Sequence, residues 1–184
     1  MRGIMFLIAV TVALAGCASL KRVDGNTINY GLDKIIVVDQ AFENIGSFEI
    51  AYSDKLENST KLSVAMTTVD IFVKKFKNTN EVVEVLSVHW TFTGNKVVWS
   101  PSIRGSKDDR FERIKNFRKE YMSQFSNAGL VMSRGFQCME SNRIIDDKVQ
   151  KSIYYCVAES IIPSGADVKV YLKDKLTESV LAVQ

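Results

Sequence analysis

The chain has few of the residue types on which metal and nucleophilic sites depend. It contains one histidine, His89, together with three cysteines and two prolines among 184 residues. A single histidine leaves few soft ligands for zinc or copper, so we expect neither a metal site nor a metal cofactor. The scarcity of proline and the apolar fraction of 46% argue against extensive disorder.

Several sequence patterns that mark known active sites are also missing. The chain has no phosphate-binding glycine loop, no dinucleotide-binding glycine pattern, no Gly-x-Ser-x-Gly, no His-Glu-x-x-His and no calcium-binding loop. His89 stands beside Trp90 on the more polar face of an expected strand, so we interpret it as a half-exposed sheet residue. A glycosidase needs only two carboxylates, which no short motif marks. We therefore expect no enzymatic activity, with a cell-wall hydrolase as the least favoured alternative.

The N-terminus carries the most specific pattern in the chain. Arg2 supplies a positive start, residues 4–13 are almost wholly apolar, and the run Leu14-Ala15-Gly16-Cys17 follows. About ten apolar residues are too few to span a bilayer as a helix, and charges interrupt every later apolar run. The order of charge, apolar core, small residues and cysteine resembles the lipobox of bacterial lipoproteins. This resemblance covers residues 1 to about 20.

The resemblance implies a membrane anchor. Cys17 would receive a diacylglycerol thioether, and residues 1–16 would be removed as a signal peptide. Two or three acyl chains hold a protein stably to a membrane, whereas one holds it only marginally. Ala18 is compatible with sorting to the outer membrane of a Gram-negative cell, with the folded part in the periplasm. In a Gram-positive cell the same segment would imply the outer face of the plasma membrane.

The mature chain is long enough for one domain and carries little net charge. Without residues 1–16 the chain has 168 residues, and its Lys+Arg count falls from 24 to 23 against 21 Asp+Glu. A formal charge of +2 gives no electrostatic reason to expect a nucleic-acid partner. We interpret residues 17–31 as the acylated cysteine and a polar tether. Residues 32–184 then form a single extracytoplasmic domain.

Two cysteines remain in the expected domain, Cys138 and Cys156. Residues 136–145 and 149–161 read as two strands, and a hairpin folded about Asp147 puts the two cysteines directly opposite each other. Because export places them where disulfides persist, we predict a disulfide between them. Closing a loop of this size stabilises a fold by roughly 3 kcal/mol in the chain-entropy model.

Two further pairs of strands are expected earlier in the chain. Residues 34–39 and 47–52 read as strands joined in a hairpin. Residues 82–92 alternate cleanly, and a two-residue turn would lead into a return strand at residues 96–99. In that second hairpin Trp90 faces Trp99. The face with these two tryptophans is either core, which we favour, or the wall of an apolar pocket.

Two segments carry helical patterns. Residues 106–128 have an apolar stripe at helical spacing, a capping serine at the start and Gly129 where a left-handed C-terminal residue belongs, so they predict a long amphipathic helix. Residues 61–77 fit a helical stripe as well, although their many β-branched residues favour a strand. We expect a helix there. A last strand is expected at residues 167–172.

These elements predict an α+β fold. A mainly antiparallel β-sheet would have one long amphipathic helix packed on one face, with a possible second helix. Arg110, Arg113 and Arg118 would lie beside the apolar stripe of the long helix. We interpret them, with Trp90 and Trp99, as a possible ligand or partner surface, while a solvated helix face is the simpler reading of the arginines.

The function that follows is a non-enzymatic one. We expect a membrane-anchored envelope lipoprotein that acts as an accessory or scaffold subunit of a cell-envelope assembly. Its partners would be the membrane, through the diacylglycerol, and other envelope proteins, and the oligomeric state stays open. The alternative is a carrier or sensor of an apolar ligand, such as a lipid, bound between the sheet and the helix.

Overall fold

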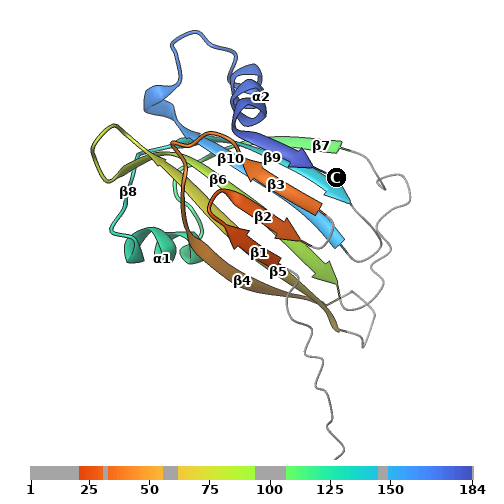
Figure 1. Cartoon of the computed structure of the whole chain (residues 1–184). Helices are drawn as coiled ribbons and strands as arrows, with labels where there is room; N and C mark the ends of the chain where they lie inside the picture. The colour runs from red at the N-terminus through yellow and green to blue at the C-terminus, as the bar shows by residue number, and fades with distance from the viewer. Residues whose placement is uncertain (1–20, 31–32, 56–61, 94–106, 145–148, 184) are drawn as a thin grey trace, which may run out of the picture.

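The computed structural model describes residues 21–30, 33–55, 62–93, 107–144 and 149–183. They form a mainly antiparallel α+β structure with two β-sheets and two α-helices (Figure 1). The strands are β1 (Lys21–Asp24), β2 (Thr27–Tyr30), β3 (Asp33–Val37), β4 (Glu43–Lys55), β5 (Leu62–Lys75), β6 (Glu81–Thr93), β7 (Lys107–Ile114), β8 (Val131–Met132), β9 (Phe136–Ile144), β10 (Val149–Ala158) and β11 (Val180–Val183). The helices are α1 (Lys119–Asn127) and α2 (Val168–Ser179), and a short 3₁₀ turn spans Glu159–Ile161.

The larger sheet, called here the large sheet, has seven strands. Six follow the order β4-β5-β6-β10-β9-β7, and β8 adds a short parallel pair to β6. Its residues alternate between two faces, as a pleated strand requires. In β5, for example, Val69 and Ile71 pack into a cluster on one face, whereas Phe72 packs into a cluster on the other. Both faces of the sheet are therefore partly covered.

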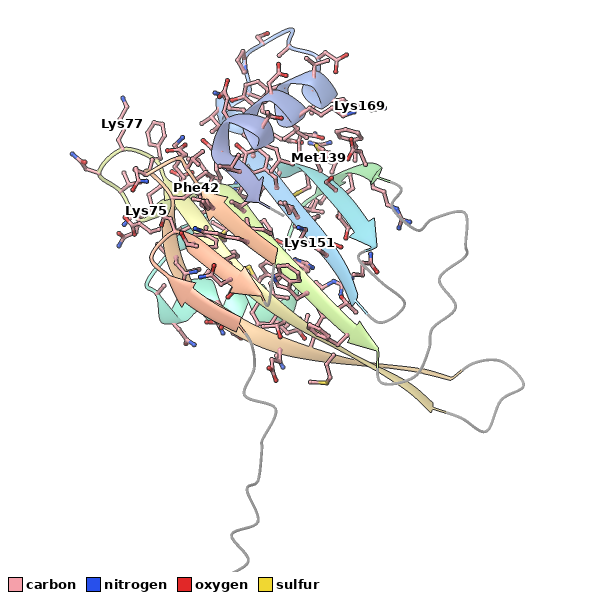
Figure 2. The ribbon with its side chains drawn as sticks, turned by 45° about the vertical axis from the view of Figure 1, so that its right-hand side comes forward. Phe42, Lys75, Lys77, Met139, Lys151 and Lys169 are labelled. Atoms are coloured by element: carbon pink, nitrogen blue, oxygen red, sulfur yellow. A yellow bond between two sulfur atoms is a disulfide. The ribbon has the colours of Figure 1, made fainter. Side chains whose placement is uncertain are left out.

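The small sheet, in the order β1-β2-β3-β11, covers one of these faces together with α2 (Figure 1). Ile28 and Ile35 from the small sheet have no exposed surface and pack with Trp90, which is 1% exposed. Phe42 and Met139 also belong to this layer (Figure 2). Asp167 caps the start of α2, because its side chain accepts hydrogen bonds from the backbone N–H groups of Lys169 and Val170. The helix buries Leu172 and Leu176 against the same cluster.

The opposite face of the large sheet is covered at one end by α1. Tyr121 and Phe125 are the buried residues of this helix, and they pack with Phe117, Phe136 and the valines of β5 and β6. Several aromatic rings meet edge to face, among them Phe117 and Phe136 with ring centroids 5.1 Å apart. No helix in the described ranges is long and apolar enough to cross a membrane.

The disulfide and the hairpin that carries it are confirmed. Cys138 and Cys156 are directly opposed in the antiparallel pair β9–β10, with Cα atoms 4.1 Å apart, and they are bonded. Both are fully buried. The strands at residues 34–39, 47–52 and 82–92 are present as β3, β4 and β6.

The long amphipathic helix predicted for residues 106–128 is wrong. Residues 107–114 form β7, which pairs with β9, and only residues 119–127 are helical. Phe111 and Ile114 are three residues apart, so in a strand they point to opposite faces. Phe111 packs with the small-sheet cluster and Ile114 with the α1 cluster. Gly129 does end the helix in the predicted left-handed conformation, with φ +67°.

The helix predicted for residues 61–77 is also wrong. This segment is β5, flanked by β4 and β6 along nearly its whole length. Its β-branched residues, which suit a pleated surface, outweighed the helical spacing of its apolar residues. Apolar side chains on both faces of the strand pack into core clusters, Val69 and Ile71 into one and Phe72 into the other, so the segment buries them without forming a helix.

Three further predictions need correction. β3 and β4 do not form a hairpin, because β3 belongs to the small sheet and β4 to the large one. Residues 21–30, expected within the tether, form the hairpin β1–β2. The strand expected at residues 167–172 is instead the start of α2, because Asp167 caps a helix. The return strand at residues 96–99, with Trp99, lies outside the described residues.

Candidate functional site

The connection between β7 and α1 separates two hollows on the α1 side of the large sheet. It comprises residues 115–118, and two of these, Asn116 and Phe117, line both hollows. Phe117 is buried and its ring packs on Phe125 and Phe136, which holds the connection against the sheet. The two hollows are named here the basic cleft and the histidine pocket.

The basic cleft has a volume of about 540 Å³. Its lining combines three cations with several apolar side chains, one carboxylate and small polar groups: Arg113, Lys115, Asn116, Phe117, Met122, Met132, Ser133, Arg134, Gly135, Phe136 and Glu159. Within the described part of the chain, Lys115 and Arg134 form no ion pair. Met122, from α1, is 40% exposed. The cleft therefore combines positively charged and apolar side chains.

Glu159 holds Arg113 at the edge of the basic cleft. The Arg113 Nε donates to Glu159 Oε1 over 2.5 Å, and its Nη2 donates to Oε2 over 2.8 Å. Gln137 Nε2 donates to the same Oε1 over 2.7 Å. The hydrogen bond from Arg113 lowers the pKa of Glu159. Two parallel bonds fix the plane of the guanidinium, while its other N–H groups can serve a ligand.

Gly135 makes room for this arrangement. Its φ is +71°, a left-handed conformation that glycine adopts without strain. A Cβ at this position would lie 2.9 Å from Glu159 Oε2. The Gly135 carbonyl also accepts a hydrogen bond from the Glu159 backbone N–H. Because Gly135 has no Cβ, the Glu159 carboxylate can lie close to the Gly135 backbone, where it binds Arg113.

The histidine pocket lies on the other side of the connection and has a volume of about 280 Å³. Its lining residues come from β4, β6, β7, the connection, α1, β9 and β10: Ile50, His89, Glu112, Ile114, Asn116, Phe117, Arg118, Tyr121, Glu140 and Tyr154. The Tyr154 hydroxyl donates to Glu112 Oε1 over 2.6 Å. Burial and this bond raise the pKa of Tyr154. The pocket is mixed in polarity, with charges of both signs.

Three polar groups meet at the base of the histidine pocket. His89 Nε2 lies 3.0 Å from Ser87 Oγ and 2.7 Å from Tyr121 Oη, and these two oxygens are 2.8 Å apart. His89 is partly buried, whereas Ser87 has no exposed surface. Burial, with a smaller contribution from the Arg118 cation, lowers the pKa of His89 to about 4. The group therefore joins α1 to β6 through a neutral imidazole.

This serine and histidine are not placed for nucleophilic catalysis. A nucleophile must reach its substrate, and Ser87 is fully buried beneath Tyr121. No cluster of three or more histidine, cysteine or acidic residues that could hold a metal ion occurs among the described residues. What the two hollows offer is hydrogen bonding, charge and apolar contact, which are the means of binding.

The structure separates the residues expected to share one surface. Arg113 lines the basic cleft and Arg118 the histidine pocket, whereas Arg110 lies exposed on β7. Trp90 belongs to the core beneath the small sheet. Of the two interpretations of its face, core or the wall of an apolar pocket, core was the favoured one. Trp99 and the expected lipidation site Cys17 lie outside the described residues.

Sequence reasoning missed the residues that organise the site. Strand alternation places Ser87 and His89 on one face, and Tyr121 belongs to the recognised apolar stripe, but nothing local indicates that they meet. Glu159 and Gly135 carry no motif at all.

Comparisons with known proteins found that no family model, no curated protein and no solved structure matches this chain significantly.

Proposed function

We propose that this protein is a lipid-anchored envelope lipoprotein that serves as a non-enzymatic accessory or scaffold subunit of a larger assembly. The lipobox-like sequence that ends at Cys17 supports the anchor, and Ala18 fits sorting to the outer membrane. On this proposal the described domain lies in the periplasm and meets its partner proteins there.

The basic cleft is the observation that carries the subunit role. Arg113 is preorganised by Glu159, while Lys115 and Arg134 add two cations with no ion pair in the described residues. Exposed Met122 supplies apolar surface in the same cleft. This combination fits an acidic segment of a partner protein with at least one apolar side chain. Charge would orient such a segment, and burial of apolar area would hold it.

The site gives less support to the alternatives. A hydrolase would need a reactive group in the cleft, but Glu159 is engaged by Arg113, and its lowered pKa makes it a poor general acid. A carrier of an apolar ligand would need an apolar cavity. Both hollows described above carry charged side chains instead, and Trp90 is packed within the core.

Site-specific photo-crosslinking in living cells tests the subunit role. A photoreactive residue at Met122 should capture a partner protein, because this side chain lines the cleft and is 40% exposed. Val170, on α2, is 55% exposed and is the matched control. We expect a discrete adduct from position 122 and none from position 170. Recovery of the monomer alone from both positions would contradict the proposal.

A charge reversal identifies the chemistry of the interaction. Arg134→Glu should reduce the adduct from position 122 at least about tenfold, because a repelled acidic segment loses on the order of 1.4 kcal/mol or more. Lys169→Glu reverses the same charge at an exposed position of α2 that does not line the cleft. An equal effect of both variants would show that net charge, rather than the cleft, matters.

A further inference from the structure

The chain that separates the proposed lipid anchor from the folded domain is very short. β1 begins at Lys21, so only residues 18–20 stand between it and Cys17. Even fully extended, the four Cα–Cα steps from Cys17 to Lys21 span at most ~14 Å. The polar headgroup layer on each side of a bilayer takes up about 5–8 Å of that length. Little reach remains beyond the lipid surface.

We infer that the acylated protein is held directly against the lipid surface, with the end of the domain at which β1 begins facing the membrane. The occupant of this surface is the bilayer that holds Cys17. The inference rests on the proposed anchor and extends it, because an anchor by itself leaves the orientation of the domain open.

The register of the small sheet identifies the membrane-facing end. β1 and β3 run in the same direction, since each is antiparallel to β2. β3 ends at Val37, and Asp39 just beyond it forms an ion pair of 3.1 Å with Lys74, near the end of β5. Lys21 therefore lies at the other end of the small sheet. Figure 1 shows the arrows of β1 and β3 both pointing toward the end of the large sheet that carries the β5–β6 turn.

The same register places two exposed residues at opposite ends of the large sheet. Met66 lies early in β5 and pairs with Phe92, close to the end of β6. Phe76 follows the last residue of β5, in the turn to β6. Ten residues of strand separate them by ~33 Å. The inference puts Met66 at the membrane-facing end and Phe76 at the far end.

Energy transfer to labelled lipid headgroups measures this orientation. Met66→Cys and Phe76→Cys form a matched pair, because the two native side chains are 40% and 41% exposed. Cys138 and Cys156 are joined in the disulfide and Cys17 would be acylated, so the introduced thiol alone takes the donor dye. The full acylated protein is placed in phospholipid vesicles with headgroup acceptors, after mass spectrometry has established the modification of Cys17.

We expect transfer from position 66 to exceed that from position 76 by about twofold or more, given the ~33 Å between them. Equal transfer, or more transfer from position 76, would overturn the orientation while leaving the anchor in place. An unmodified Cys17 would overturn the anchor and the orientation together. These two failures are therefore distinguishable.

Lengthening the link between Cys17 and β1 tests whether its shortness is what orients the domain. Twenty Gly and Ser residues inserted between Ser19 and Leu20 add a flexible link with a mean span of ~25 Å. We expect the difference between positions 66 and 76 to disappear, because the short link would no longer impose an orientation. A difference that survives the spacer would show that the lipid surface is bound by the domain itself, and it would overturn the role of the link.

Discussion

At the scale of single residues, His89 illustrates how burial sets the chemistry of a side chain. The imidazole joins Ser87 and Tyr121 at the contact between β6 and α1, and its neutral form is favoured because a buried cation is costly beside Arg118. Protonation would place charge in this contact. His89 therefore stabilises the attachment of α1 only while it is neutral.

We predict that His89 makes the protein less stable as the pH is lowered. The pKa of His89 is about 4 in the folded protein against an ordinary value of 6.5, so its contribution is complete above pH 6.5 and is lost as the pH falls toward 4. Linkage puts the loss at about 2 kcal/mol by pH 5 and about 3 kcal/mol by pH 4. Urea unfolding of the wild type and of His89→Gln between pH 7 and pH 4 isolates this contribution from that of the carboxylates. An identical pH dependence in both proteins would refute it.

Alanine substitutions at two glycines distinguish the cost of a left-handed backbone conformation from the cost of a steric clash of the added Cβ. Gly129 and Gly135 have similar left-handed conformations, with φ of +67° and +71°. A Cβ at Gly129 meets nothing within 4 Å, whereas one at Gly135 meets Glu159 Oε2. We expect Gly129→Ala to lower the unfolding free energy by about 1 kcal/mol. Gly135→Ala should cost more and should also weaken the crosslink from position 122, because it displaces the carboxylate that fixes Arg113. Equal losses from the two variants would show that Glu159 yields freely.

At the scale of elements, the hairpin β9–β10 is the part whose tertiary contacts were predicted most fully. Two alternating strands and a short turn define the register, and the register opposes Cys138 to Cys156. Replacing both by alanine should lower the unfolding free energy by roughly 3 kcal/mol, the value for a loop of this length. Denaturation of the double variant beside the oxidised wild type measures it. Coincident unfolding midpoints would mean that the bond contributes nothing to stability.

The other elements show where local patterns mislead. Residues 107–114 carry apolar side chains at a spacing that a helix and a two-faced strand can both satisfy. The choice depends on β9, which offers an edge for pairing, and on α2, whose Lys169 and Lys173 lie over the Phe111 ring. Likewise β5 is a strand because β4 and β6 flank it. β9, by contrast, begins more than 20 residues after β7 ends, so the pairing partner of β7 lies outside any short window of the chain.

At the scale of the whole molecule, the two proposals concern opposite ends of one domain. The basic cleft lies at the end where β8 pairs with the start of β6, and Met66 lies at the end where β6 finishes. On the two proposals together, the cleft faces away from the lipid and is accessible to a partner protein. The photoreactive residue at Met122 should therefore yield protein adducts rather than lipid adducts, which extraction and mass analysis of the crosslinked products would distinguish.

The sequence by itself determined features that depend on neighbouring residues. These are the lipobox-like segment, the strands β3, β4, β6, β9 and β10, the α+β class, the left-handed Gly129 and the disulfide register. Tertiary structure alone decided the division into two sheets, the strand character of residues 62–75 and 107–114, and the meeting of Ser87, His89 and Tyr121. The physical reason is that strand pairing and interlayer packing join residues far apart in the chain, so their energies are absent from any local pattern.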